Sequence, residues 1–150
     1  MPDCSASTAN DTLGGMQTRS RIASVVLAAV LAVGGLTACS GGSNAITQVT
    51  TATASEVLAK PGMSVIDVRT PGEFAQGHIQ GAVNIDVEDA AFATNVGKLP
   101  KDKPYFVYCR SGNRSGVATS KMADLGFTEI YDLQGGITQW QNAGGAVVLN

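Results

Sequence analysis

Short apolar runs alternate with helix-like segments from residue 45 onward, and this alternation limits the fold more than any other feature. The expected strands are 45–49, 64–68, 82–85, 105–108 and 129–133. The expected helices are 53–60, 88–96, 116–125 and 137–142, with one helical turn around Glu73 and Phe74. Short strands that alternate with helices indicate a parallel sheet covered on both faces. We therefore expect an α/β fold with a central, mostly parallel, five-stranded sheet between two layers of helices.

The N-terminal segment has the parts of a secretory signal. Residues 22–38 carry no charge, and Arg19 and Arg21 precede them. The end of this segment, Leu36-Thr37-Ala38-Cys39, resembles a bacterial lipobox, in which the cysteine thiol receives a diacylglyceryl group. The alternative is an uncleaved signal anchor that ends in an incidental cysteine. We expect lipidation at Cys39 and an extracytoplasmic, membrane-anchored lipoprotein.

These features divide the chain into three parts. Residues 1–38 are the expected signal peptide, 39–52 the lipidated cysteine and a flexible tether, and 53–150 the folded domain. Residues 1–15 contain two acidic residues and no basic one, unlike the start of a signal peptide, so translation starting at Met16 is an alternative.

Charge and cysteine content narrow the possible functions. The net charge is −2, and no basic cluster follows residue 39, which argues against a nucleic-acid partner. Of the three cysteines, Cys4 is expected to leave with the signal peptide and Cys39 to be lipidated. Cys109 is then the remaining thiol, in a compartment where thiols are exposed to oxidation. Such a thiol is expected to be either deeply buried or chemically active.

Cys109 opens a loop with the features of an anion site. Cys-Arg-Ser-Gly-Asn-Arg-Ser (109–115) follows an expected strand, and ligands of parallel sheets bind beyond the carboxyl ends of strands. Gly112 permits a backbone curl that turns N–H groups inward, and the following helix adds its N-terminal partial charge. Arg110 and Arg114 add full charges. These effects favour the thiolate of Cys109 and binding of an oxyanion. The alternative is a buried structural cysteine beside two solvated arginines.

The spacing within the loop separates two cysteine chemistries. Four residues, 110–113, lie between Cys109 and Arg114. Protein tyrosine phosphatases place their arginine one residue further along, where this chain has Ser115. A serine cannot clamp phosphoryl oxygens with two parallel hydrogen bonds as arginine does. A phosphatase is therefore the less favoured alternative.

Residues 53–145 resemble a single-domain rhodanese. Several separated motifs carry the resemblance: Asp67-Val-Arg-Thr-Pro-Gly-Glu-Phe74, Gly77-His-Ile79, Gly81-Ala-Val-Asn84, the loop 109–115, and Leu133-Gln-Gly-Gly136 followed by Trp140. The resemblance implies a rhodanese-like three-layer sandwich with thiosulfate sulfurtransferase activity. It implies no metal and no organic cofactor. We expect a monomer.

The resemblance also implies roles for the loop. Cys109 would take the outer sulfur of thiosulfate or a similar anionic donor, release sulfite, and pass its persulfide sulfur to cyanide or a thiol. Arg110 and Arg114 would hold the donor, and N–H groups from Arg110, Ser111, Gly112, Asn113, Arg114 and Ser115 would stabilise the persulfide. The alternative is a module that carries or binds persulfide sulfur without efficient thiosulfate turnover.

Other motif residues have two interpretations each. Asp67 is a candidate for orienting a loop arginine, and an ion pair of Arg69 with Glu73 is at least as well supported. His78 is expected to form a packing turn rather than to act as a base. Trp140 is expected in the core, with an edge near the pocket. Val117, Met122 and Leu125 are expected to share the buried face of their helix.

Overall fold

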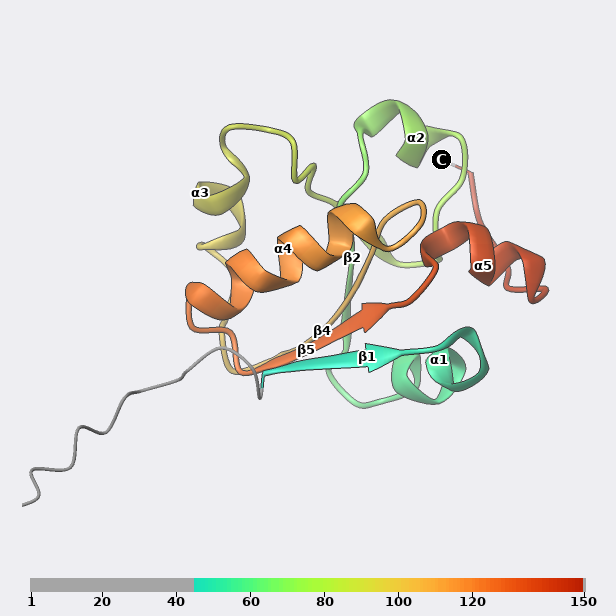
Figure 1. Cartoon of the computed structure of the whole chain (residues 1–150), viewed down its shortest axis with the longest axis horizontal. Coiled ribbons are helices and arrows are strands. Elements are labelled where there is room, and N and C mark those ends of the chain that lie inside the picture. The colour runs from blue at the N-terminus through green and yellow to red at the C-terminus, as the bar shows by residue number, and fades with distance from the viewer. Residues whose placement is uncertain (1–44, 150) are drawn as a thin grey trace, which may run out of the picture. The chain divides into compact units, whose positions relative to one another are not determined.

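The structure is a computed structural model that describes residues 45–149 (Figure 1). The expected signal peptide, including Arg19, Arg21 and the lipobox at Cys39, lies outside the described residues. The strands are β1 (Ile46–Val49), β2 (Ser64–Asp67), β3 (Ala82–Asn84), β4 (Pro104–Tyr108) and β5 (Glu129–Leu133). The helices are α1 (Thr51–Leu58), α2 (Pro71–Ala75), α3 (Phe92–Val96), α4 (Asn113–Asp124) and α5 (Gly136–Asn142). Within residues 45–149, no helix has the length and apolar character needed to cross a membrane.

The five strands form one sheet in the order β1-β5-β4-β2-β3, and every pair of neighbours is parallel. Figure 1 shows α4 on one side of the sheet and α1 on the other. The cores agree, because side chains of α3 and α4 pack in one hydrophobic cluster and those of α1 and α5 in the other. The expected α/β three-layer fold is confirmed, and the sheet is parallel throughout.

Strand β4 is central and contributes to both cores. Val107 and Cys109 face the core under α4, whereas Phe106 and Tyr108 face the core under α5. The main chain of β4 has hydrogen-bonded strands on both sides, and helices cover both faces of the sheet, so the side chains of β4 are buried on both faces. This places Cys109 at the carboxyl end of a central strand, with its side chain directed toward α4.

The folded domain begins earlier than residue 53. Residues 46–49 form β1, which pairs with β5 from Ile46 opposite Ile130 onward, and α1 begins at Thr51. Residues 46–52, which were expected to belong to the tether, are therefore part of the folded domain. β1 belongs to the sheet because pairing with β5 satisfies its backbone groups.

Helix α3 is shorter than the expected 88–96. The side chains of Asp86 and Asp89 accept hydrogen bonds from the backbone N–H groups of Glu88 and Ala91. Such local bonds compete with helical ones, so the helix begins only at Phe92.

Helix α4 begins at Asn113, three positions before the expected start at residue 116. Its buried face also differs from expectation. Val117 is 52% exposed, and the buried apolar residues of the helix are Ala118, Met122 and Ala123. Helical side chains three and four positions apart share a face, and Val117 does not belong to this set.

Candidate functional site

Cys109 lies at the end of β4 with its thiol enclosed by the loop that follows. The residue is 1% exposed. The backbone N–H of Gly112 donates a hydrogen bond to Cys109 Sγ over 3.1 Å. Gly112 has a φ of 100°, in the left-handed region that favours glycine, and this conformation curls the loop back over the sulfur. This N–H is placed to stabilise negative charge that develops on the sulfur.

The first turn of α4 closes the loop from the other end. The backbone N–H of Gly116 and the hydroxyl of Ser115 both donate to the carbonyl oxygen of Gly112, over 3.1 and 3.0 Å. Ser115 is fully buried, with its side chain turned into the protein. Ser111 and Asn113 are exposed. The side chains of the loop therefore divide between solvent and core.

Helix α5 holds the cysteine loop through backbone hydrogen bonds. The N–H of Ile137 donates to the carbonyl of Cys109 over 2.9 Å, and the N–H of Thr138 donates to that of Arg110 over 3.2 Å. A Cβ atom at Gly136 would lie 2.6 Å from the carbonyl oxygen of Arg110, and closer still to that of Cys109. Only glycine allows this approach. Sequence reasoning assigned no role to Gly136, although the adjacent Gly135-Gly136 pair was the available signal.

Arg114 points away from the loop and into an ion pair. Its Nη2 lies 2.7 Å from Glu73 Oε1, and its Nη1 lies 2.8 Å from Glu73 Oε2 and 3.2 Å from Glu88 Oε2. The hydrogen bond from Arg114 lowers the pKa of Glu73 to about 2. Arg114 thus joins α4 to α2 and the chain before α3, because the first turn of α4 directs its side chain outward. The role of Arg114 in holding the anionic donor stays a prediction.

Asp67 and Arg69 form a buried pair at the end of β2. Arg69 Nε donates to both carboxylate oxygens of Asp67 over 3.0 Å, and its Nη2 donates to Oδ2 over 2.6 Å. The same Nη2 also donates to the carbonyl of Gly77 over 2.7 Å. Asp67 therefore orients Arg69 and not a loop arginine, and Arg69 does not pair with Glu73. These contacts differ from both expectations, because Asp67 pairs with Arg69 and Glu73 pairs with Arg114.

A polar cavity of about 300 Å³ lies beside the cysteine loop. Two arginines from separate segments, Arg69 and Arg110, contribute to its wall. The other lining residues are Glu73, Gln76, Gly77, Ile137, Thr138 and Gln141. Glu73 is paired with Arg114 and Arg69 with Asp67, so the guanidinium of Arg110 and the uncharged donors are the groups that suit an anionic ligand. Arg110 follows Cys109 in the chain, so the cavity borders the cysteine loop, although Cys109 itself does not line it.

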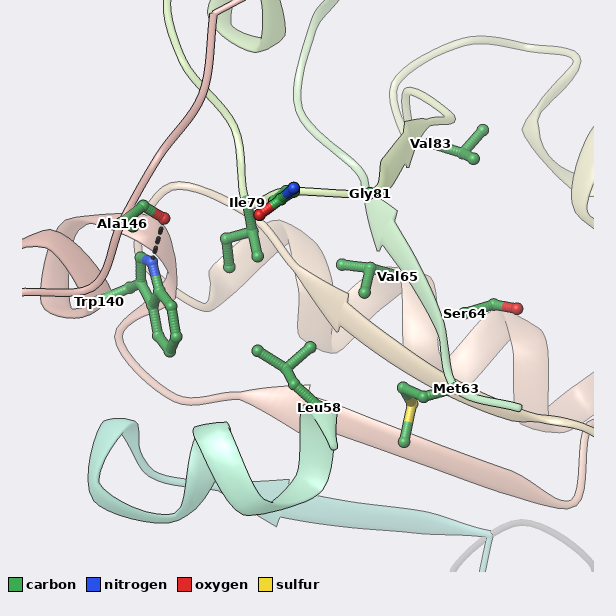
Figure 2. Close-up of a pocket in the computed structure, with 10 residues that line it drawn as sticks. Leu58, Met63, Ser64, Val65, Ile79, Gly81, Val83, Trp140 and Ala146 are labelled. Atoms are coloured by element: carbon green, nitrogen blue, oxygen red, sulfur yellow. Dashed lines mark hydrogen bonds between the residues drawn. The ribbon is translucent and has the colours of Figure 1, made fainter. Parts of the chain in front are cut away.

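His78 and Trp140 lie in packing environments. His78 is buried and stacks on Phe74 with ring centroids 3.8 Å apart, as a packing turn requires. Trp140 donates its indole N–H to the carbonyl of Ala146 over 2.9 Å. Its edge lines a groove, but this groove is a different one from the polar cavity. Figure 2 shows it between Trp140, Leu58 and Val65, and no residue of the loop 109–115 lines it.

Metal binding has no candidate ligand set in the part of the chain that the structure describes. Within residues 45–149, no three His, Cys, Asp or Glu side chains come together to hold an ion.

Comparison with known proteins adds a family to this geometry. Residues 50–143 match the family model described as "Rhodanese-like domain". The chain is 43% identical over 76 residues to the uncharacterized protein YqhL of Bacillus subtilis, covering 51% of this chain and 59% of that protein. It is 35% identical over 88 residues to the thiosulfate sulfurtransferase GlpE of Pseudomonas putida, covering 59% of this chain and 78% of that enzyme.

A solved structure agrees with the fold. The crystal structure of a rhodanese-related protein from Thermoplasma volcanium superposes with a TM-score of 0.61 at 34% identity. The match covers 69% of this chain and 98% of the other.

Proposed function

Because the chain belongs to the rhodanese-like domain family, we propose that it is a sulfurtransferase that carries sulfur as a persulfide on Cys109. The observation that carries the proposal is the Gly112 N–H bonded to Cys109 Sγ at the carboxyl end of β4, beside a cavity lined by Arg69 and Arg110. The 35% identical relative named a thiosulfate sulfurtransferase supports thiosulfate as the donor.

The reaction consists of two displacements. The Cys109 thiolate attacks the outer sulfur of thiosulfate, the S–S bond of thiosulfate breaks, and sulfite leaves with the bonding electron pair. The terminal sulfur of the resulting persulfide is then attacked by cyanide or a thiolate, which restores the Cys109 thiolate. This sequence is a double displacement, with ping-pong kinetics.

Different groups of this chain stabilise the sulfur and bind the anionic donor. N–H groups of the loop, with Gly112 foremost, stabilise negative charge on the sulfur. Arg110, which has no ion-pair partner among residues 45–149, attracts the anionic donor into the cavity, whereas the charge of Arg69 is balanced by Asp67. The N–H groups of Ile137 and Thr138 donate hydrogen bonds to the carbonyls of Cys109 and Arg110. These bonds hold the N–H groups of the loop in position before sulfur transfer.

Removal of the Cys109 thiol tests this proposal. Full-length Cys109→Ser protein is expected to form no thiocyanate from thiosulfate and cyanide, because a hydroxyl cannot hold the transferred sulfur. Cys39→Ala is the matched control, since it also removes a cysteine but not the site, and thiocyanate formation should persist in detergent extracts. Unchanged turnover in Cys109→Ser would overturn the mechanism.

A persulfide carrier without efficient thiosulfate turnover is the second candidate. Cys109 is 1% exposed, so a sulfur donor must reach an enclosed sulfur atom, and this favours the carrier. Mass spectrometry would detect one added sulfur on Cys109 in both cases, so steady-state thiosulfate kinetics discriminates between them. A phosphatase is less well supported still, because Glu73 engages the guanidinium of Arg114, and an aryl-phosphate assay tests it.

We further propose that the protein acts outside the cytoplasm as a monomer, tethered to a bacterial membrane by lipid on Cys39. The lipobox-like sequence 36–39 and the uncharged segment before it support this location. The sulfur acceptor would then be an extracytoplasmic thiol or cyanide.

A further inference from the structure

Residues 146–149, which we call the strap, pair with the loop between α2 and β3. The N–H of Val148 donates to the carbonyl of His78 over 2.8 Å, and the N–H of His78 donates to the carbonyl of Val148 over 3.0 Å. The two residues form an isolated antiparallel bridge outside the main sheet. Nothing in the proposed mechanism so far uses this pairing.

Helix α5 holds the other end of the strap. The indole N–H of Trp140 donates to the carbonyl of Ala146 over 2.9 Å, the hydrogen bond drawn in Figure 2. The N–H of Gly145 donates to the carbonyl of Trp140 over 2.8 Å. A Cβ atom at Gly145 would overlap the indole ring, so the chain passes over Trp140 as closely as glycine allows. These contacts fix where the strap begins.

The bridge to His78 is connected to the polar cavity through Gly77. Gly77 lines the cavity, and its carbonyl accepts a hydrogen bond from Arg69 Nη2 over 2.7 Å. The Nε and Nη2 atoms of Arg69 also bind Asp67. The strap, Gly77 and Arg69 are therefore joined by an unbroken series of backbone and side-chain contacts.

One donor nitrogen of Arg69 remains for a ligand. Among residues 45–149, Arg69 Nη1 has no hydrogen-bond partner, although the residue is only 6% exposed. Within the same residues, the one buried side-chain atom left without a partner is Asp132 Oδ1. Arg69 Nη1 must therefore be open to the cavity that Arg69 lines, and it carries two N–H donors.

Both sides of this cavity depend on α5. The first turn of the helix donates to the carbonyls of Cys109 and Arg110, which holds the side that carries Arg110. Trp140 in the last turn holds the strap, which in turn holds the side that carries Gly77. Such a hydrogen-bonded frame sets the donors of the cavity in place before an anion arrives.

We propose that Val148 is a positioning residue, whose hydrogen bonds with His78 hold Gly77 and Arg69 so that Arg69 Nη1 binds the oxygens of an anionic sulfur donor. Arg110 supplies the net attraction, and Arg69 supplies a directed hydrogen bond, since Asp67 balances its charge. That the anion is a sulfur donor rests on the proposed function, whereas the anion preference of the cavity does not.

Alkylation of Cys109 by two small reagents measures the anion preference without sulfur transfer. Iodoacetate carries a carboxylate, and iodoacetamide carries an uncharged amide in its place. Val148→Pro in the full chain removes the N–H that donates to His78. The ratio of the iodoacetate rate to the iodoacetamide rate, followed on the Cys109 peptide by mass spectrometry, should fall by about 3- to 10-fold, the factor expected for one net hydrogen bond.

Two variants are matched controls. Val148→Ala trims the side chain but keeps the N–H. Leu149→Pro places proline at the next position, where the N–H has no partner among residues 45–149. Both should keep the wild-type ratio. A purely structural role of the strap would leave the ratio unchanged in Val148→Pro as well, because local opening admits both reagents equally.

Trp140→Phe is a second variant that loosens the strap at its other end. Phenylalanine keeps an aromatic ring but has no N–H for the carbonyl of Ala146, so the ratio should fall by a smaller factor than in Val148→Pro. An unchanged ratio in folded Val148→Pro protein, or an equal fall in Leu149→Pro, would overturn the proposal. If Val148→Pro does not fold, the ratio in Trp140→Phe decides in the same way.

Steady-state kinetics extends the test to sulfur transfer. In a double displacement, kcat/KM for thiosulfate reports the first half-reaction and kcat/KM for the acceptor reports the second. Val148→Pro should lower kcat/KM for thiosulfate by the same 3- to 10-fold or so and leave kcat/KM for an uncharged thiol acceptor unchanged. If wild type does not turn over thiosulfate, the proposed function fails, and the alkylation ratio still decides the role of the strap.

Discussion

Gly136 lies against the backbone of Cys109 and Arg110, closer than any side chain permits. This contact lets the first turn of α5 donate hydrogen bonds to the carbonyls of Cys109 and Arg110. Helix α5 therefore holds the loop in place through its backbone. The two arginines of the loop divide in a similar way. Arg110 lines the polar cavity, whereas Arg114 forms an ion pair with Glu73. At this scale, residue type alone does not determine role.

Gly136→Ala is expected to destabilise the protein and impair the site. The φ of Gly136 is 57° and that of Gly144 is 84°, so both are left-handed, but an added Cβ at Gly144 meets no atom within 4 Å. Gly144→Ala should therefore lower the free energy of unfolding by roughly 1–2 kcal/mol for the backbone alone. Gly136→Ala should cost about 1–3 kcal/mol more, from the clash. Urea denaturation measures both, and equal losses would contradict the clash.

The short helix α2 depends on its neighbours at the scale of elements. Thr70 and Glu73 form a capping box at its start, with Pro71 as the first helical residue. The Glu73 carboxylate accepts from the backbone N–H of Thr70 and also binds Arg114, so it both caps α2 and connects it to the helix that follows the cysteine loop. Five helical residues are too few to be stable alone, and this connection compensates.

The Glu73–Arg114 connection predicts a pH dependence of stability. The pKa of Glu73 falls from 4.5 to about 2, so its contribution is present above pH 4.5 and is lost as the pH falls through 2. The stability advantage of wild type over Glu73→Gln should therefore shrink as the pH falls across this window. Glu88→Gln is the control, because the Glu88 side chain is 61% exposed and its pair with Arg114 contributes little. Urea midpoints measured through the window test this, and a constant difference would contradict it.

For the molecule as a whole, the sheet order β1-β5-β4-β2-β3 places β4 between β5 and β2. The ends of β2 and β4, and the start of α5 after β5, therefore meet at one edge of the sheet. Arg69, Arg110 and Thr138 line the same cavity for this reason. The folded domain extends back to β1, which leaves a short chain between it and Cys39.

The proposed lipid anchor makes a prediction for the full-length chain in a bacterial host. Cys39→Ala should abolish acylation, and the protein should be soluble or remain an unprocessed precursor. Cys4→Ala, which lies before the signal segment, should leave acylation unchanged. Fractionation with mass analysis of the N-terminus tests this. A mature acylated Cys39→Ala protein in the membrane fraction would contradict the anchor.

Local sequence patterns were sufficient for the strands, the helical turn at Pro71 and the loop that begins at Cys109. Apolar runs determine where strands form, and the turn and loop residues restrict only their own backbone. The helix starts were less predictable, because the side chains of Asp86 and Asp89 bond to nearby backbone and delay α3. The buried face of α4 depended on its orientation against the sheet, which left Val117 exposed.

The sequence by itself determined the parallel α/β fold and the position of Cys109 at the end of a buried strand. Only the tertiary structure decided that Arg114 meets Glu73 and that Gly136 contacts the Cys109 carbonyl. The physical reason is that each of these contacts joins segments far apart in the chain. Strand order and helix orientation bring them together, and no local pattern specifies which side chains then meet.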